Sequence, residues 1–213
     1  MSKIRVARKP EDAYQHGNLR EALIQAALKL LSEGGAAALS LRAAAQLAGV
    51  SHAAPYRHFR DKNALIAAVA EKGFRLLAAR MADEAATLPS DDIAARLDAI
   101  GVGYVAFALE HPGYFRIIFS GLAACDAPSP ELEEAGRLAY QTLHGLVAEG
   151  IEKGVFRAGN PDELSLAAWS LVHGLGMLAI DGALAPQLAG KPAFLRAAAT
   201  VTQLLRTGLL QTR

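Results

Sequence analysis

Helix start and stop signals recur along the whole chain, and alanine and leucine dominate the segments between them. Ser129-Pro130-Glu131 and Asn160-Pro161-Asp162 each place a capping side chain, a first-turn proline and an acid in the order that a helix N-terminus favours. Hydrophobic residues make up 52% of the chain but aromatic residues only 6%, a balance that favours helices over pleated sheets. The sequence therefore predicts an all-α protein.

The same signals divide the chain into about nine helices. Gly34-Gly35 and Gly49 are stops, Ser51 is expected to cap a short helix, and Asp61 caps a long one. The expected helices cover roughly residues 18–34, 41–48, 52–60, 62–86, 92–111, 112–120, 131–153, 162–184 and 192–210. We expect a flexible basic arm over 1–17, a head over 18–66 and a helical body over 67–213, joined by the long helix.

Charge is distributed unevenly between the head and the body. The whole chain has a net charge of +1, but residues 1–62 carry ten basic and five acidic side chains, which leaves −4 for the remainder. A basic head on a mildly acidic body predicts a polyanionic partner for the head and a different kind of partner for the body.

The sequence also indicates where the protein resides. A single cysteine, Cys125, excludes an internal disulfide and fits a reducing cytoplasm. The charged N-terminus lacks the apolar core of a signal peptide. The uncharged stretch over 164–180 is shorter than the ~20 residues that a membrane-spanning helix needs. We expect a cytoplasmic protein with no membrane partner.

Two short helices are expected to meet across Gly49-Val50-Ser51. In a helix-turn-helix unit the helices cross steeply, so their contact points must be small and the turn must admit a residue with positive φ. Ala45 and Gly49 fit these two requirements. This arrangement leaves Arg42 and the exposed face of residues 52–58 free to contact DNA.

The amino-acid sequence of this region resembles the DNA-binding signature of the TetR family of transcription regulators. The resemblance is carried by LSLRAAAQLAGVS over 39–51 and PYRHFRDKNAL over 55–65. Its most specific part is Tyr-x-His-Phe followed by a lysine three residues later, at this distance from Gly-Val-Ser. The resemblance covers residues 16–66 and implies a dimeric regulator with a DNA-binding head and a ligand-sensing body.

The family resemblance also implies roles for individual residues of the head. It assigns phosphate contacts to Ser40, Tyr56, His58 and Lys62. The side chains that it places nearest to the base edges are those of Arg42, His52, Ala53 and Ala54. Ser51 and Arg57 complete the candidate DNA-binding set, although Arg57 fits a solvated charge equally well. Phe59 is expected in the core of the head. Pro55 stands where many relatives carry leucine or isoleucine, so we expect a slight bend in the recognition helix.

The body contains two weaker resemblances. Residues 169–175, WSLVHGL, resemble the Trp-x-x-x-His-Gly element of one class of TetR-type C-terminal domain, and HPGYFR over 111–116 is similar to that class. A small-molecule pocket needs apolar walls with a few polar groups. The candidates to form them are Tyr104, Phe107, Phe115, Phe119, Tyr140, His144, Trp169, His173 and Met177. The alternative is that most of these side chains are ordinary core.

The implied partners of the body are an apolar or aromatic small molecule and a second copy of the chain. No cofactor and no metal are expected, because His111, His144 and His173 lie on separate segments without a completing thiol or carboxylate. Homodimerisation is expected through the last two helices, since two heads about 34–36 Å apart read half-sites one turn apart on a palindromic operator. The predicted contact residues are Gly174, Leu178, Ala185, Ala198, Val201, Leu205 and Leu209.

Two other interpretations of the chain remain open at this point. One is a helical enzyme, for example a metal-dependent hydrolase, but the sequence contains no phosphate loop and no pair of carboxylates beside a nucleophile. The other is a dimerisation protein whose DNA-binding head is vestigial. Tyr56, His58 and Lys62 argue against that interpretation. We therefore expect a regulator without enzymatic activity, and specifically a repressor that a ligand releases from DNA.

Overall fold

The computed structural model describes residues 16–121, 129–184 and 188–210. The arm predicted over 1–17 falls almost wholly outside these ranges, as do Cys125 and Ala185. Within them the chain is helical, and no strand occurs apart from an isolated bridge between Phe156 and Leu210. The all-α prediction is confirmed.

Eight α-helices and one 3₁₀ turn form the described part of the chain. They are α1 (His16–Ala38), α2 (Leu41–Leu47), the 3₁₀ turn η1 (Ala54–Arg57), α3 (Lys62–Ala86), α4 (Ile93–Glu110), α5 (Pro112–Phe119), α6 (Pro130–Glu152), α7 (Pro161–Ile180) and α8 (Gly190–Leu209). The helix expected over 52–60 is the one that differs most from prediction, because only the single turn η1 forms there.

Capping side chains begin most of the long helices where the sequence predicts. Asp61, Asp92 and Ser129 accept hydrogen bonds from the backbone N–H groups of Ala64, Ala95 and Leu132, respectively. Asn160 caps α7 in the same way through the N–H of Asp162. Each bond satisfies one of the N–H groups that a helix start leaves without an intrahelical partner.

Three predicted boundaries are corrected by the structure. The first helix begins at His16, two residues before Asn18, and Gly35 breaks it with φ 63° and ψ −164°, so that only one further turn reaches Ala38. Ser51 does not cap a helix, because η1 has no side-chain cap. The helix predicted to reach 184 ends at Ile180, since Gly182 adopts a positive φ of 72° that favours glycine and terminates the helix.

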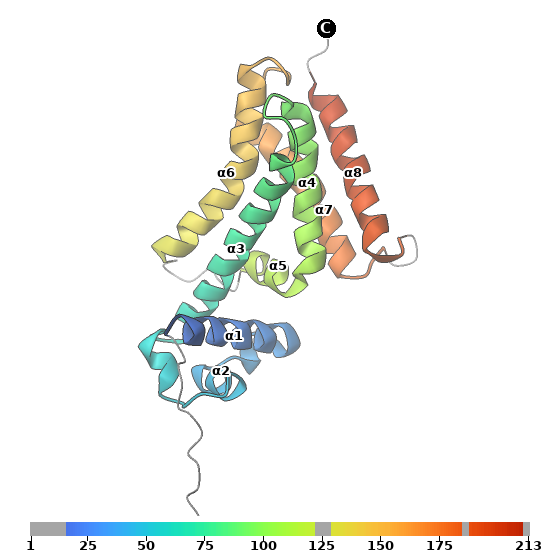
Figure 1. Cartoon of the computed structure of the whole chain (residues 1–213). Helices are drawn as coiled ribbons and strands as arrows, with labels where there is room; N and C mark the ends of the chain where they lie inside the picture. The colour runs from blue at the N-terminus through green and yellow to red at the C-terminus, as the bar shows by residue number, and fades with distance from the viewer. Residues whose placement is uncertain (1–15, 122–128, 185–187, 211–213) are drawn as a thin grey trace, which may run out of the picture.

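Helix α4 is the centre of the body. It packs against α3, α5, α6, α7 and α8, and the run from Tyr104 to Ala108 is buried. Figure 1 shows the head, built from α1, α2 and η1, at one end of α3, with the remaining helices gathered around the other end. The unbroken helix α3 therefore belongs to both parts, as the sequence predicts.

A second connection between the head and the body runs through the short helix α5. The Nε2 group of Gln25 on α1 donates a hydrogen bond of 3.0 Å to the hydroxyl of Tyr114. A Cβ on Gly113 would lie 2.6 Å from the hydroxyl oxygen of Ser32, and a Cβ on Gly73 would lie 2.7 Å from Ile118. Glycines at these two positions allow α5 to press closely against both α1 and α3.

Helix α7 is long and apolar enough to cross a membrane by length and composition alone. In this structure it packs against α4, α6 and α8, and its first turn carries Asp162 and Glu163. Only 28% of this apolar window is buried within the protein, because Leu166, Leu171 and Leu178 are exposed.

Candidate nucleic-acid interface and internal cavity

The helix-turn-helix geometry rests on a few small residues. Ala44 and Ala45 of α2 are fully buried, and Gly49 adopts φ 70° in the turn that follows. The N–H of Val50 donates to the carbonyl of Ala45 at 3.0 Å, which closes the turn. The roles predicted for Ala45 and Gly49 are confirmed.

Pro55 explains why η1 is a 3₁₀ turn rather than the expected α-helix. Proline has no N–H to donate four residues back to Ser51, whose carbonyl instead accepts from Ala54 at 3.0 Å. Pro55 itself is buried, and the N–H groups of His58 and Phe59 both donate to its carbonyl at 2.9 Å. The segment thus closes in one tight turn before Asp61 starts α3.

Most candidate DNA-binding side chains lie on the outside of the head. The exposed ones are Ser40, Arg42, Ser51, His52, Ala53, Tyr56 and Arg57. Tyr56 has an exposed fraction of 55%, whereas Phe59, three residues later, is 3% exposed and fills the core. The guanidinium of Arg20 lies 5.7 Å from the ring centroid of Phe59 and closes that side of the core.

Two of the candidate residues already make hydrogen bonds within the protein, and a third is partly buried. Ser40 accepts a hydrogen bond from the N–H of Ala43 and so caps α2, which leaves its hydroxyl proton free to donate outward. The Nζ group of Lys62 donates to the carbonyl of Ala36. His58 is half-buried, and its Nε2 atom is enclosed without a hydrogen-bond partner among the described residues. An outward contact by His58 would therefore use Nδ1.

A cavity of about 460 Å³, partly open to solvent, lies between α3, α4, α6, α7 and α8, with α5 at one end. Its walls are apolar apart from two tyrosines, a tryptophan and a threonine. They are formed by Phe74, Leu77, Met81, Leu97, Ile100, Gly101, Tyr104, Ile118, Phe119, Gly136, Ala139, Tyr140, Leu143, Ala168, Trp169, Val172, Thr202 and Leu205. This volume lies in the range of pockets that hold a drug-sized molecule.

Four of the nine predicted ligand-binding residues lie on the cavity wall: Tyr104, Phe119, Tyr140 and Trp169. The structure does not bring the other five there. Phe107 and Phe115 are fully buried in the core, where their rings lie 6.3 Å apart, and Met177 packs against the core. The Nε2 atom of His144 lies 3.1 Å from a carboxylate oxygen of Asp162. His173 does not line the cavity but hydrogen-bonds to Tyr104, which does.

Sequence reasoning missed the aliphatic part of the wall. Leu77 and Met81 on α3 follow one another at helical spacing, as do Leu97, Ile100 and Gly101 on α4. This spacing is the ordinary signature of core packing, so no feature of the residues themselves separates a cavity wall from a filled core. Aromatic side chains were the visible signal, and they identified Tyr104, Phe119, Tyr140 and Trp169 but missed Phe74, which also lines the cavity.

A hydrogen-bonded chain holds one side of the cavity. The indole N–H of Trp169 donates to the hydroxyl of Tyr104 at 3.0 Å, and that hydroxyl lies 2.8 Å from Nδ1 of His173. Burial lowers the pKa of His173, which favours its neutral form, and the Tyr104 proton then satisfies Nδ1. Burial also raises the pKa of Tyr104, so the linked side chains of Trp169, Tyr104 and His173 carry no net charge near neutral pH.

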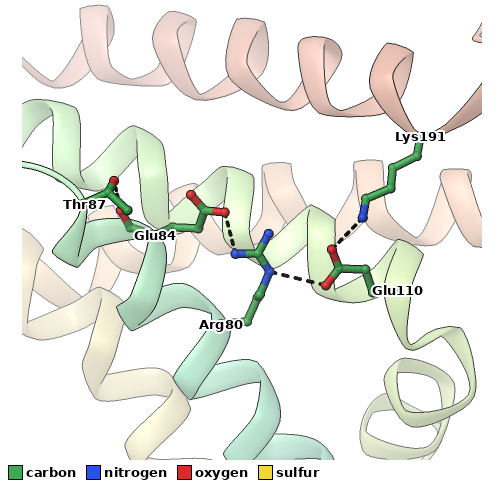
Figure 2. Close-up of polar contacts among 5 residues, drawn as sticks. All are labelled: Arg80, Glu84, Thr87, Glu110 and Lys191. Atoms are coloured by element: carbon green, nitrogen blue, oxygen red, sulfur yellow. Dashed lines mark hydrogen bonds and ion pairs between the residues drawn. The ribbon is translucent and has the colours of Figure 1, made fainter.

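Ion pairs connect α3 to α4 and α4 to α8 (Figure 2). The Arg80 guanidinium on α3 bonds Glu84 of the same helix and reaches Glu110 at the end of α4, with Nε 3.3 Å from Oε2. The other oxygen of Glu110 accepts from Nζ of Lys191 on α8 at 2.6 Å. The Lys191 hydrogen bond is the largest influence that holds the pKa of Glu110 below its usual value. These contacts lie beside the close crossing at Gly103, where a Cβ would meet the carbonyl of Arg80 at 3.0 Å.

The outward faces of α7 and α8 differ in part from the predicted dimer surface. Ala198 and Leu209 are buried within the protein, and Leu205 lines the cavity, so these three do not face outward. Gly174 does face open space, and Leu178 is 46% exposed. The exposed apolar side chains of the two helices also include Leu166, Leu171 and Leu204.

Comparison with known proteins connects both parts of the chain to one family. Residues 23–69 match the model described as "Bacterial regulatory proteins, tetR family", and residues 97–204 match the model described as "Tetracyclin repressor-like, C-terminal domain". No curated protein gives a significant match.

Solved structures share the whole fold. A protein with unknown function from Rhodococcus sp. RHA1 is 32% identical, with 94% of this chain and 100% of that chain covered and a TM-score of 0.80. A TetR family transcription regulator from Marinobacter aquaeolei VT8 is 18% identical (91% and 96% covered, TM-score 0.73). The TetR family regulator PfmR from Thermus thermophilus is 21% identical (89% and 99% covered, TM-score 0.68).

A helix-turn-helix head carried on a helical body by one continuous helix defines a DNA-binding transcription regulator. The two family matches, the second of which spans half of the chain, extend that class to a specific membership. The chain belongs to the TetR family.

Proposed function

We propose that this regulator is a repressor that binds a palindromic operator as a homodimer and is released from DNA by a small molecule bound in the internal cavity. The observation that carries the proposal is the position of α5. Ile118 and Phe119 of this helix line the cavity, while Gly113 and Tyr114, one turn earlier, contact α1 of the head. A molecule that fills the cavity would therefore touch a helix that also supports the head.

The proposed DNA contacts follow from the exposed surface of the head. Tyr56 and the Ser40 hydroxyl would donate to phosphates, and Lys62 would add its charge at the N-terminus of α3, where the helix dipole already favours an anion. For Lys62 to reach a phosphate, its bond to the carbonyl of Ala36 must be shared or exchanged. Arg42 would read a base edge, with His52 and Ala53 beside it.

Dimerisation would use the outward face of α7 and α8. Leu166, Leu171 and Leu178 lie along α7, and Leu204, at 70% exposed, is the most exposed of the large apolar side chains described. Two copies that bury these residues against each other would form a four-helix interface. The same proposal divides the chain at residue 66, with DNA binding before it and sensing and dimerisation after it. It also includes a cytoplasmic location.

Release would require the two heads to change their separation or tilt. Because α3 is continuous from Lys62 to Ala86, a shift of its cavity-lining residues Phe74, Leu77 and Met81 would move the head at its other end. A coupling free energy of ~1–3 kcal/mol is typical of such systems and would suffice to change operator occupancy.

Fluorescence anisotropy with DNA from upstream of the protein's own gene tests the proposal, with scrambled DNA of the same composition as control. We expect tighter, salt-sensitive binding to the upstream DNA, since phosphate contacts release counterions. Arg42→Ala should lower the preference for the specific DNA by about 1–3 kcal/mol, the usual value of a bidentate contact. Arg137→Ala, which removes the same charge from an exposed site on α6, is the matched control and should change nothing.

Two outcomes would overturn parts of this proposal. Absence of binding to either DNA at low salt would favour the alternative of a vestigial head. A monomer in sedimentation at micromolar concentration, with full affinity for a single half-site, would remove the dimer and the palindrome together. Transcription from the operator-bearing promoter, measured with and without the protein, separates repression from activation.

A further inference from the structure

We infer that the cavity takes an uncharged, apolar molecule and rejects molecules that carry a carboxylate, phosphate or other anionic group. This inference rests on the proposed function, because it specifies the chemical class of the molecule that the body would sense. Its basis is the chemistry of the wall rather than the size of the cavity.

No side chain of Asp, Glu, Lys, Arg or His is among the described residues that line the cavity. Fourteen of the eighteen lining residues have purely apolar side chains or are glycine. An ionic group transferred from water to such surroundings loses its hydration and gains no opposite charge, so its burial is strongly unfavourable.

The few polar groups on the wall are already engaged within the protein. The Trp169 indole donates to Tyr104, and the Tyr104 hydroxyl is bonded to His173. The Thr202 hydroxyl donates to the carbonyl of Ala199 at 3.1 Å. Tyr140 donates to Asp162 at 3.3 Å. An ionic ligand would have to break these bonds to obtain partners, whereas an apolar ligand leaves them intact.

One ion pair lies next to lining residues in the sequence, and its two charges are already paired with each other. Asp98 of α4 and Arg206 of α8 lie beside the lining residues Leu97 and Leu205, and Nε of Arg206 is 2.7 Å from Oδ2 of Asp98. The two side chains neutralise one another at less than one-third exposure. A ligand carboxylate would have to displace Asp98 and leave that carboxylate without its partner.

Two fluorescent probes that differ by one ionic group test the inference directly. N-phenyl-1-naphthylamine and 8-anilinonaphthalene-1-sulfonate share the same ring system, but only the second carries a sulfonate. Titrated into the full-length protein, the uncharged probe is expected to have a Kd at least about tenfold below that of the sulfonate.

A cavity-filling variant identifies where each probe binds. Ala139 lies on the wall and is 6% exposed, so Ala139→Phe would occupy the space of the ligand. We expect this variant to lose most of its affinity for the uncharged probe. Sulfonate fluorescence that persists in Ala139→Phe is assigned to the exposed apolar surface and is subtracted.

A pair of rim variants keeps the test valid if Ala139→Phe does not fold. Tyr140 lies on the wall and is 38% exposed, whereas Leu138, on the same helix, is 42% exposed and lies off the wall. Tyr140→Lys brings a cation to the cavity and should reduce the preference for the uncharged probe about tenfold or more. Leu138→Lys should leave that preference unchanged.

Equal or tighter binding of the sulfonate inside the cavity, lost in Ala139→Phe, would overturn the inference. An unchanged preference in Tyr140→Lys would overturn it as well, because charge would then not decide what the cavity accepts. Addition of each probe to the preformed DNA complex separates this result from the proposed function. An uncharged probe that binds without releasing DNA supports the inference and contradicts ligand-induced release.

Discussion

The head presents most of its candidate contact residues on its surface, whereas the body holds most of its candidate contacts between its helices, with Tyr140 exposed at the rim. Tyr56 and Arg42 are exposed, while Tyr104 is buried and Phe119 is half-buried. An exposed face binds through particular polar side chains at fixed spacing, and such a face leaves a motif in the sequence. An internal cavity is built from apolar residues that resemble any core, and its position depends on how the helices pack.

The largest expected effect separates stability from binding inside the head. Phe59→Ala should lower the free energy of unfolding by about 3–5 kcal/mol, because it removes a buried ring. Tyr56→Ala should change the free energy of unfolding by no more than about 0.5 kcal/mol, since the side chain is largely exposed, yet it should weaken DNA binding. Urea unfolding and DNA anisotropy measure the two effects. Equal destabilisation by both variants would mean that Tyr56 also supports the core.

A second prediction concerns the joint between the head and the body. Gly73→Ala would place a Cβ 2.7 Å from Ile118 and 3.2 Å from the Tyr114 ring, so overpacking should cost about 1–3 kcal/mol of stability. Gly145→Ala, on the open side of α6, has nothing within 4 Å and should stabilise the protein by ~0.5–1 kcal/mol, the usual helix preference for alanine. Thermal unfolding compares the two. A stabilising Gly73→Ala would show that the joint is loosely packed.

A third prediction asks whether the two parts communicate through α5. Gln25→Leu and Tyr114→Phe each remove the 3.0 Å hydrogen bond between α1 and α5, and a double-mutant cycle should give a coupling of about 0.5–1.5 kcal/mol. In each variant, a given concentration of ligand should also release less DNA than it does from the wild type. Wild-type release in both variants would leave α3 as the route between cavity and head.

The smallest expected effect belongs to the ion pairs of the body. Glu110→Gln should cost less than about 1 kcal/mol at pH 7, because the pairs are partly exposed and screened by solvent. The folded pKa of Glu110 is lowered from 4.5, so its contribution is present above that value and is lost as the pH falls through the folded pKa. Wild type and variant, compared by urea unfolding from pH 7 to pH 3, should converge at the acid end. A constant difference would mean that the substitution acts through packing.

The sequence predicted local structure well where a single side chain decides it. Asp61 and Ser129 fix the starts of α3 and α6 by accepting one backbone N–H each, and that bond depends only on residues nearby in the chain. Gly49 was identified for the same reason, since a positive φ is a local requirement. The motif in the head combined several such local requirements, which is why its exposed face could be inferred before the fold was known.

Prediction failed where a residue's role depends on distant neighbours. Phe107 and Phe115 have the same side chain as Phe119, but only Phe119 reaches the cavity, because the packing of α4 and α5 turns the other two into the core. Ala198 and Leu209 suited a dimer face by composition, yet they point into their own subunit. Pro55 shows a milder failure, since a bent helix was expected and a single 3₁₀ turn formed.

Warming the protein should shift the balance of forces at the crossing of α3, α4 and α8. The hydration of charged groups carries a negative entropy, so the cost of removing Arg80, Glu110 and Lys191 from water falls as the temperature rises. Hydrophobic contacts gain no comparable advantage on heating. The ion pairs shown in Figure 2 should therefore contribute a larger share of the stability of this helix crossing near the melting temperature than at low temperature. Variants of Glu110 should then differ from wild type most clearly in heated samples.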